Sequence, residues 1–172
     1  MKRVGRVGIM AVVVGMATFF AIWWFSAEQV LKRRVGDLID AAEVSKLTSD
    51  LARQTRGQKI AGYFGKEVAV VPPGDVSGDI AGRLDDGTMT RDRLVMLYSM
   101  AARGSREISF VDLEVRDVSV DGDRAEVPFR VDCVVDLDSR RPVDGLLDVQ
   151  SQWVKSDDAW QIVELSWTEA GR

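Results

Sequence analysis

The stretch Arg124 to Asp138, RAEVPFRVDCVVDLD, decides the fold. Its apolar side chains stand at every second position, and the positions between them are mostly charged. Because successive side chains of a strand point to opposite faces of a sheet, this period predicts one long strand with a dry and a wet face. A strand of that kind is typical of antiparallel sheets. Pro128, on the wet face, predicts an edge or a bulge. The dry face consists of Ala125, Val127, Phe129, Val131, Cys133, Val135 and Leu137.

The segments on either side of this strand continue the same pattern. Asp121-Gly122 is a hairpin signal that joins it to a preceding strand, about Ile108 to Val120. Two further strands are predicted after it, at about Leu146 to Lys155 and Trp160 to Thr168. The carboxyl-terminal half therefore predicts a meander of four long antiparallel strands.

The amino-terminal half has helical periodicity. Helices are expected from Ser26 to about Val44, with Ser26 in a capping box, from Thr48 to Phe64, and from the N-cap Thr90 to Gly104. Gly57 and Gly62 suggest that the second helix is broken. A stripe of Leu94, Leu97, Tyr98 and Ala101 should face inward on the third helix, with Met96 and Met100 in core or rim packing. A short strand, Lys66 to Val71, precedes a polar loop, Gly74 to Gly87, that includes one short strand near Ile80 to Leu84. The fold class is α+β, with three helices packed on a curved antiparallel sheet.

The run Val7 to Phe25 contains nineteen residues without a charge and follows Lys2, Arg3 and Arg6. A helix of that length spans roughly 30 Å, the thickness of the hydrocarbon core of a bilayer. A cleavable signal peptide has a shorter run and a small-residue cleavage site, which is absent here. Trp23 and Trp24 fit the headgroup level at the end of an anchor. We expect residues 1–25 to be a tail and a single transmembrane helix, and residues 26–172 to be one domain.

Orientation and partners follow from the residues around this run. The bases Lys2, Arg3 and Arg6 lie directly against it, which favours an amino terminus inside the cell and a periplasmic domain at a bacterial inner membrane. One face of the run carries small residues, which permit close approach of a partner helix in lipid. The predicted contacts with the membrane or with a partner helix are Gly8, Ala11, Gly15, Thr18, Trp23 and Trp24.

Charge and composition exclude several classes of function. The 147 residues after Phe25 contain 20 Lys+Arg against 27 Asp+Glu, a net charge of −7, which gives no electrostatic reason to bind nucleic acid. Histidine is absent and Cys133 is the only cysteine, so the commonest general base, the commonest transition-metal ligand and any intrachain disulfide are all missing. We expect no cofactor and no metal.

Three segments resemble the nuclear transport factor 2-like superfamily, which has a cone-shaped α+β fold. They are Ile60 to Phe64 leading into Glu67 to Val70, the hairpin Val118 to Val127, and the ending Trp153 to Leu165, in which a strand, a polar turn and Trp160-Gln161-Ile162 follow one another. The resemblance covers about Ser26 to Thr168. It implies the cone but not the activity, since the superfamily includes isomerases, dehydratases, cyclases, ligand binders and assembly domains.

Enzymes of this superfamily place an acid or a His–Asp pair inside the cone. In this sequence Asp112 and Glu114 share a predicted face with Phe110 and Val118 and are the acids that would enter it, where a dry pocket would raise one pKa. Acids at such positions lie more often on the open rim of a twisted strand. Tyr63 and Tyr98 are likewise more often core residues than functional groups of a pocket. The predicted pocket residues are Tyr63, Tyr98, Phe110, Asp112, Glu114, Phe129 and Trp153.

Two functions remain open. The first is a non-catalytic accessory or assembly subunit of a membrane complex, whose partners are the lipid bilayer and other subunits. Its plan resembles single-pass proteins of bacterial secretion systems and membrane proteins associated with lipid importers, and an accessory subunit of an energy-transducing complex would look the same. The second is a membrane-tethered binder or enzyme for a small apolar ligand in the cone. If Trp153, Trp160, Trp167, Phe110 and Phe129 fill the cone, no ligand fits.

Overall fold

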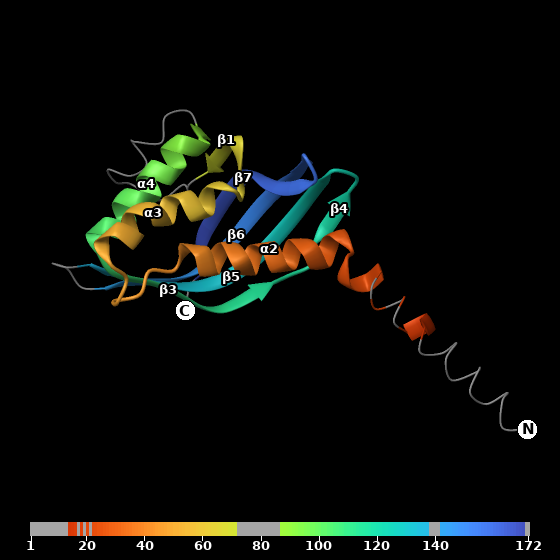
Figure 1. Ribbon diagram of the computed structural model, residues 1–172, viewed down its shortest axis with the longest axis horizontal. Coiled ribbons are helices and arrows are strands. Elements are labelled where there is room, and N and C mark those ends of the chain that lie inside the picture. Colours follow the sequence, from red (N-terminus) through yellow and green to blue (C-terminus); the bar gives the residue numbers. More distant parts are fainter. Residues whose placement is uncertain are drawn as a thin grey trace, which may run out of the picture.

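The structure is a computed structural model that describes residues 14–16, 18, 20, 22–71, 87–137 and 142–170, without the side chain of Gln54. Three helices and seven strands follow the amino-terminal segment (Figure 1). Their bounds are α2 Ala27–Ala42, α3 Asp50–Ala61, β1 Phe64–Val71, β2 Thr88–Thr90, α4 Arg91–Gly104, β3 Ser105–Val115, β4 Ser119–Asp121, β5 Arg124–Leu137, β6 Val143–Ser156 and β7 Ala159–Ala170.

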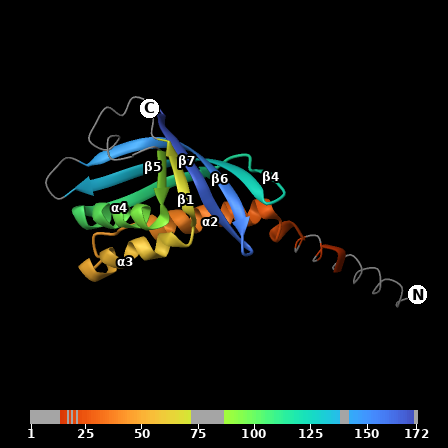
Figure 2. The same ribbon diagram turned by 90° about the horizontal axis from the view of Figure 1, so that it is seen from above.

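The strands form one curved sheet in the order β2-β1-β7-β6-β5-β3, with β4 also paired to β5. The meander from β3 to β7 is antiparallel, as predicted. The prediction of a purely antiparallel sheet is wrong, because β1 pairs with β7 in parallel. This pairing joins the first and last long strands, so no local pattern signals it. The three helices lie together on one side of the sheet (Figure 2), which makes the α+β layers of the predicted cone.

Strand β5 is an interior strand of the sheet, with β6 on one side and β3 and β4 on the other. Its dry face is buried from Ala125 to Val131 and only half-buried from Cys133 onward. Pro128 does not lie on an edge strand, because β6 and the β3–β4 segment flank β5. It faces the interruption between β3 and β4, where Arg116 N donates to Pro128 O at 2.9 Å. The predicted single strand from Ile108 to Val120 is therefore two strands.

Helices α2 and α4 begin at the predicted caps. The Ser26 hydroxyl accepts from Gln29 N, and the Thr90 hydroxyl accepts from Arg93 N. In α4 the most buried positions are Val95, Ser99 and Ala102. Leu94, Leu97 and Tyr98 of the predicted stripe are half-buried against the core, and only Ala101 is exposed. Met96 and Met100 are exposed, in contrast to the predicted core or rim packing.

Helix α3 is continuous through Gly57, so the predicted break there is wrong. A Cβ at Gly57 would lie 2.2 Å from the Ser99 hydroxyl oxygen and 2.8 Å from the Val95 carbonyl oxygen. The glycine allows α3 to approach α4 closely. The helix ends before Phe64, which belongs to β1, and its Leu51 is exposed.

The core lies between the helices and the concave face of the sheet. Its buried side chains come from α2, α3 and five of the strands, and the largest fully buried side chain is the indole of Trp153. They are Leu31, Val35, Leu38, Ile60, Phe64, Val68, Val70, Met89, Ala125, Val127, Phe129, Val131, Val149, Trp153, Trp160 and Ile162.

The segment before α2 is helical at Ile22–Trp24 and is interrupted at Phe25 and Ser26. The extended backbone of Ser26 (φ −60°, ψ 147°) separates this helical segment from α2. Within the described ranges, no helix has the length and apolar character needed to cross a membrane. Most of the run from Val7 lies outside those ranges.

Candidate functional site

The interior of the cone, where a ligand of this architecture would bind, is occupied by aromatic side chains. Trp153 is 0% exposed, and Phe129 and Trp160 are each 4% exposed. The Trp153 indole N–H donates to the Ser151 hydroxyl at 2.8 Å, and that hydroxyl donates to the Val127 carbonyl at 2.7 Å. These two hydrogen bonds satisfy the polar atoms beside the indole, so Trp153 is a packed core residue at the base of the cone.

Asp112 and Glu114 lie outside the cone and are exposed, which agrees with the more common alternative given for such acids and not with an acid site in the pocket. The register of β3 against β5 shifts between Val111 and Glu114, and Asp112 adopts a left-handed φ of 53°. The resulting bulge turns Leu113 toward the core and leaves both acids exposed. A dry two-acid site is therefore absent at these positions.

Glu114 lies in register with Arg130 on the outer, convex face of the sheet. There the Arg130 guanidinium donates to both carboxylate oxygens of Asp148, at 3.0 and 2.8 Å, and Arg116 contacts the same carboxylate at 2.9 Å. The hydrogen bond from Arg130 lowers the pKa of Asp148. These charges are already paired and cross-link β5 to β6.

The two predicted tyrosines are packing residues. The Tyr98 hydroxyl donates to the Ala42 carbonyl and ties α4 to the end of α2. Burial raises the pKa of Tyr98 to about 12, so the phenol is neutral at physiological pH. Tyr63 lies under the Arg34 guanidinium, 5.0 Å from ring centroid to Cζ, and its pKa is raised chiefly by burial. Neither phenol lines any of the three surface hollows described below.

The predicted pocket residues divide as follows. Phe129 and Trp153 are buried in the core, Tyr63, Tyr98 and Phe110 are packed against it, and Asp112 and Glu114 lie outside. Tyr98 and Phe110 also contact the smaller cluster of Val44, Ala102 and Ile108. The side chains brought together are thus apolar ones. Cys133 is half-buried on the same face, and burial raises the pKa of its thiol, which keeps it protonated and unreactive.

Arg53 of α3 is a central residue that the sequence analysis missed. Its side chain is 8% exposed, and its guanidinium donates to five main-chain carbonyl oxygens, at 2.8 to 3.3 Å for the four bonds of ordinary length. These carbonyls belong to the α2–α3 connection and to the end of α4 with the start of β3. Arg53, Gly57 and Ile60 follow at helical spacing and are all buried, but the spacing alone does not distinguish a buried base from a solvated one. The acceptors are Ser45, Thr48, Ala102, Ser105 and Arg106.

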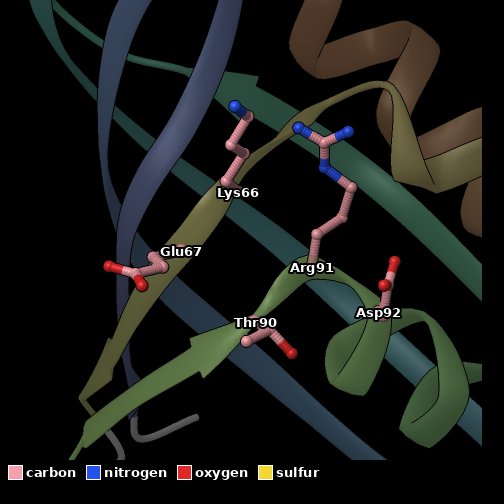
Figure 3. Close-up of a pocket in the computed structure, with 5 residues that line it drawn as sticks. All are labelled: Lys66, Glu67, Thr90, Arg91 and Asp92. Atoms are coloured by element: carbon pink, nitrogen blue, oxygen red, sulfur yellow. The ribbon is translucent and has the colours of Figure 1, made fainter.

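The hollows formed by described residues open on the surface. One of about 390 Å³ lies where β1 and β2 meet the start of α4 and is lined by Lys66, Glu67, Thr90, Arg91 and Asp92 (Figure 3). In it Lys66 and Arg91 extend to the same side, while Glu67 points away from them. Arg91 Nε donates to the Gly65 carbonyl at 3.3 Å, so its guanidinium is held against β1.

A second hollow of about 390 Å³ is lined by Lys46, Arg53, Arg106 and Asp136. All five donors of Arg53 are engaged by carbonyls, and Lys46 pairs with Glu107 at 3.2 Å. A third hollow, of about 270 Å³, lies over β4 and β5. None of the three is lined by a predicted pocket residue. Among the described residues, no group of three or more Cys, Asp or Glu is arranged to hold a metal ion.

The predicted membrane contacts fall partly outside the described residues, as Gly8 and Ala11 do. Gly15 and Thr18 are in helical conformation, and the Thr18 hydroxyl donates to the Val14 carbonyl at 2.9 Å. Trp23 and Trp24 are 45% and 42% exposed and form a ring cluster with Phe20, with centroids 5.7 to 6.3 Å apart. These rings have no partner in the core of the domain.

Comparison with solved structures identifies the fold. No family model and no curated protein matches the chain. Among solved structures, an NTF2-like protein from Cytophaga hutchinsonii superposes over 85% of this chain and 100% of its own, with a TM-score of 0.57 and 13% identity. The chain has the nuclear transport factor 2-like fold.

Other similar structures include a protein of unknown function and an enzyme. A protein of unknown function from Mycobacterium tuberculosis matches at 19% identity and a TM-score of 0.55, over 84% of this chain and 75% of its own. A hexachlorocyclohexane dehydrochlorinase from Novosphingobium barchaimii matches at 12% identity and a TM-score of 0.53, over 83% and 89%. At such identities the likeness gives the fold alone, so the function must be argued from this chain's own residues.

Proposed function

We propose that the chain is a non-catalytic accessory or assembly subunit of a membrane protein complex. A single amino-terminal helix from Val7 to Phe25 anchors it, and its nuclear transport factor 2-like domain lies on the periplasmic side of a bacterial inner membrane. The partners are the lipid bilayer and other subunits of the complex.

The observation that carries the proposal is the packed cone. Catalysis in this architecture needs a cavity that admits a substrate and a titratable group that faces it. Here Trp153, Trp160 and Phe129 occupy the interior, and the two acids on β3 are turned outward by the bulge at Asp112. Among the described residues, the buried hydroxyls of Ser99, Ser105 and Ser151 and the half-buried hydroxyl of Tyr98 all donate to main-chain carbonyls.

The alternative is a membrane-tethered enzyme or binder of a small apolar ligand. The name of the Novosphingobium barchaimii neighbour favours this alternative, since that protein has a similar fold and is a dehydrochlorinase of a chlorinated hydrocarbon. Binding here would require Trp153 to leave its hydrogen bond to Ser151. A panel of apolar compounds that raises the thermal midpoint of the protein in a concentration-dependent way would support this alternative over the assembly role.

Topology and assembly can be tested together in native membranes. In a Cys133→Ala background, a cysteine at exposed Ser156 in the β6–β7 turn should react with a membrane-impermeant maleimide in intact spheroplasts. Mild solubilisation should then release the chain in a complex of fixed stoichiometry that survives high salt. A chain that is protected from the reagent contradicts the orientation, and a chain that elutes alone contradicts the assembly role.

A further inference from the structure

The joint between the amino-terminal segment and α2 is held by Arg33. Its Nη2 donates to the Trp24 carbonyl at 2.9 Å, and its guanidinium carbon lies 4.4 Å from the centroid of the Trp24 ring. A second link crosses the interruption, since Ser26 N donates to the Trp23 carbonyl at 3.1 Å. The hydrogen bond and the ring contact of Arg33, together with the Ser26 hydrogen bond, thus hold Trp24 and its neighbours against α2.

The aromatic cluster on the far side of this joint is exposed. Phe20 is 57% exposed, and Trp23 and Trp24 stack beside it with almost half of their surface open. In sequence, uncharged residues from Val7 lead up to the cluster, whereas Glu28 and three consecutive bases from Lys32 follow it. The rings therefore mark the boundary between an apolar segment and a charged helix.

We propose that Phe20, Trp23 and Trp24 dock in the headgroup layer of a phospholipid bilayer, and that Arg33, locked on Trp24, holds the domain in a fixed orientation to that layer. This inference rests on the membrane anchor proposed above. Indole rings favour this depth because one side is apolar and the N–H remains wet. The guanidinium beside them is complementary to lipid phosphate.

The chemistry of the cluster favours lipid over a protein occupant. A partner helix in a membrane packs against small residues that let the backbones approach, and three large rings prevent that approach. The neighbouring bases are arranged to support the domain rather than a partner: Lys32 pairs with Glu28 at 2.7 Å, and Arg34 donates to the Gly62 carbonyl at 3.1 Å. Arg33 is the base that lies at the rings.

Depth-resolved quenching tests the docking surface. The full chain is reconstituted in phosphatidylcholine vesicles with bromine near the headgroup or near the chain end. Shallow bromine should quench tryptophan emission more than deep bromine, and the difference should vanish in the double variant Trp23→Phe, Trp24→Phe. The remaining tryptophans suit this control, because Trp153 and Trp160 are buried in the domain and Trp167 packs against its core.

The outcomes separate this inference from the anchor itself. If the chain does not float with the vesicles, the membrane-held function is wrong. If it floats but neither bromine depth quenches Trp23 and Trp24, the anchor stands and the lipid docking surface is overturned. Cross-linking of the same variant chains would then identify a second copy or another helix as the occupant.

Amide hydrogen exchange in the same vesicles tests the lock. Arg33→Ala should speed exchange of the Ser26 amide by about tenfold, because both contacts to Trp24 are lost. The matched control, Lys32→Ala, removes the same charge one residue away and should leave that amide unchanged. Equal exchange in the two variants would show that Arg33 does not fix the joint.

Discussion

Replacement of Arg53 by alanine should be one of the most damaging single changes in the domain. The guanidinium donates to five main-chain carbonyls. Two of these bonds, to Ala102 and Ser105, are buried. Water that enters through the adjoining hollow can serve the outer three, but not these two. A buried carbonyl left without a donor, or a lost hydrogen bond from a charged group, costs about 1.5–3 kcal/mol.

The free energy of unfolding should therefore fall by about 3–6 kcal/mol in Arg53→Ala, a large part of the 5–15 kcal/mol typical of a domain. Arg53→Lys keeps the charge but offers one nitrogen in place of a planar fork, so it should recover less than half of the loss. Arg56→Ala is the matched control, because Arg56 lies on the same helix with one bond of 3.3 Å to the Ala41 carbonyl.

Urea denaturation of residues 26–172, followed by tryptophan fluorescence, measures these differences. The comparison covers the native fragment, Arg53→Ala, Arg53→Lys and Arg56→Ala. It is valid where the free energy of unfolding has the same dependence on urea concentration in all four. The reasoning is refuted if Arg53→Ala loses no more than Arg56→Ala, since the five carbonyls would then be satisfied without the guanidinium.

Three further changes probe other parts of the molecule. Gly57→Ala should lower stability by about 1–3 kcal/mol, because its methyl group meets Ser99 and the Val95 carbonyl, and Ser99→Ala should restore only the part due to the hydroxyl, as thermal denaturation would measure. The pKa of Tyr98 is raised from 10.0 to about 12, so between these pH values Tyr98 keeps its proton in the folded protein and loses it in the unfolded chain. The free energy of unfolding should therefore fall as the pH rises from 10 to 12. Urea midpoints compared across this range should show a smaller fall in Tyr98→Phe. Deletion of residues 1–25 should leave a folded, soluble domain without catalytic activity, since the core begins at α2; turnover of any small substrate by this fragment would contradict the proposed function.

The sequence predicts local features of this fold well. The alternation of β5 and the caps at Ser26 and Thr90 depend on neighbouring residues, and the structure confirms them. The turn at Asp157 and Asp158 was also expected, and both residues adopt the left-handed conformation that a tight hairpin needs.

The errors arise where distant segments decide the outcome. Gly57 resembles a helix breaker until α4 is packed against it, and the parallel pairing of β1 depends on β7 at the other end of the chain. The bulge at Asp112 changes which face the following residues occupy, so the predicted pocket acids move outside. Arg53 looks like a solvated base, and only the carbonyls that surround it reveal its role.

The parallel pairing of β1 with β7 also constrains biosynthesis. Phe64–Val71 leaves the ribosome well before the strand on which it aligns, Ala159–Ala170. Until Ala159–Ala170 has emerged, the helices have no completed sheet to cover, so their apolar sides need a chaperone or one another. A premature stop shortly before Ala159 should thus yield a product that is degraded, not a shortened but functional domain.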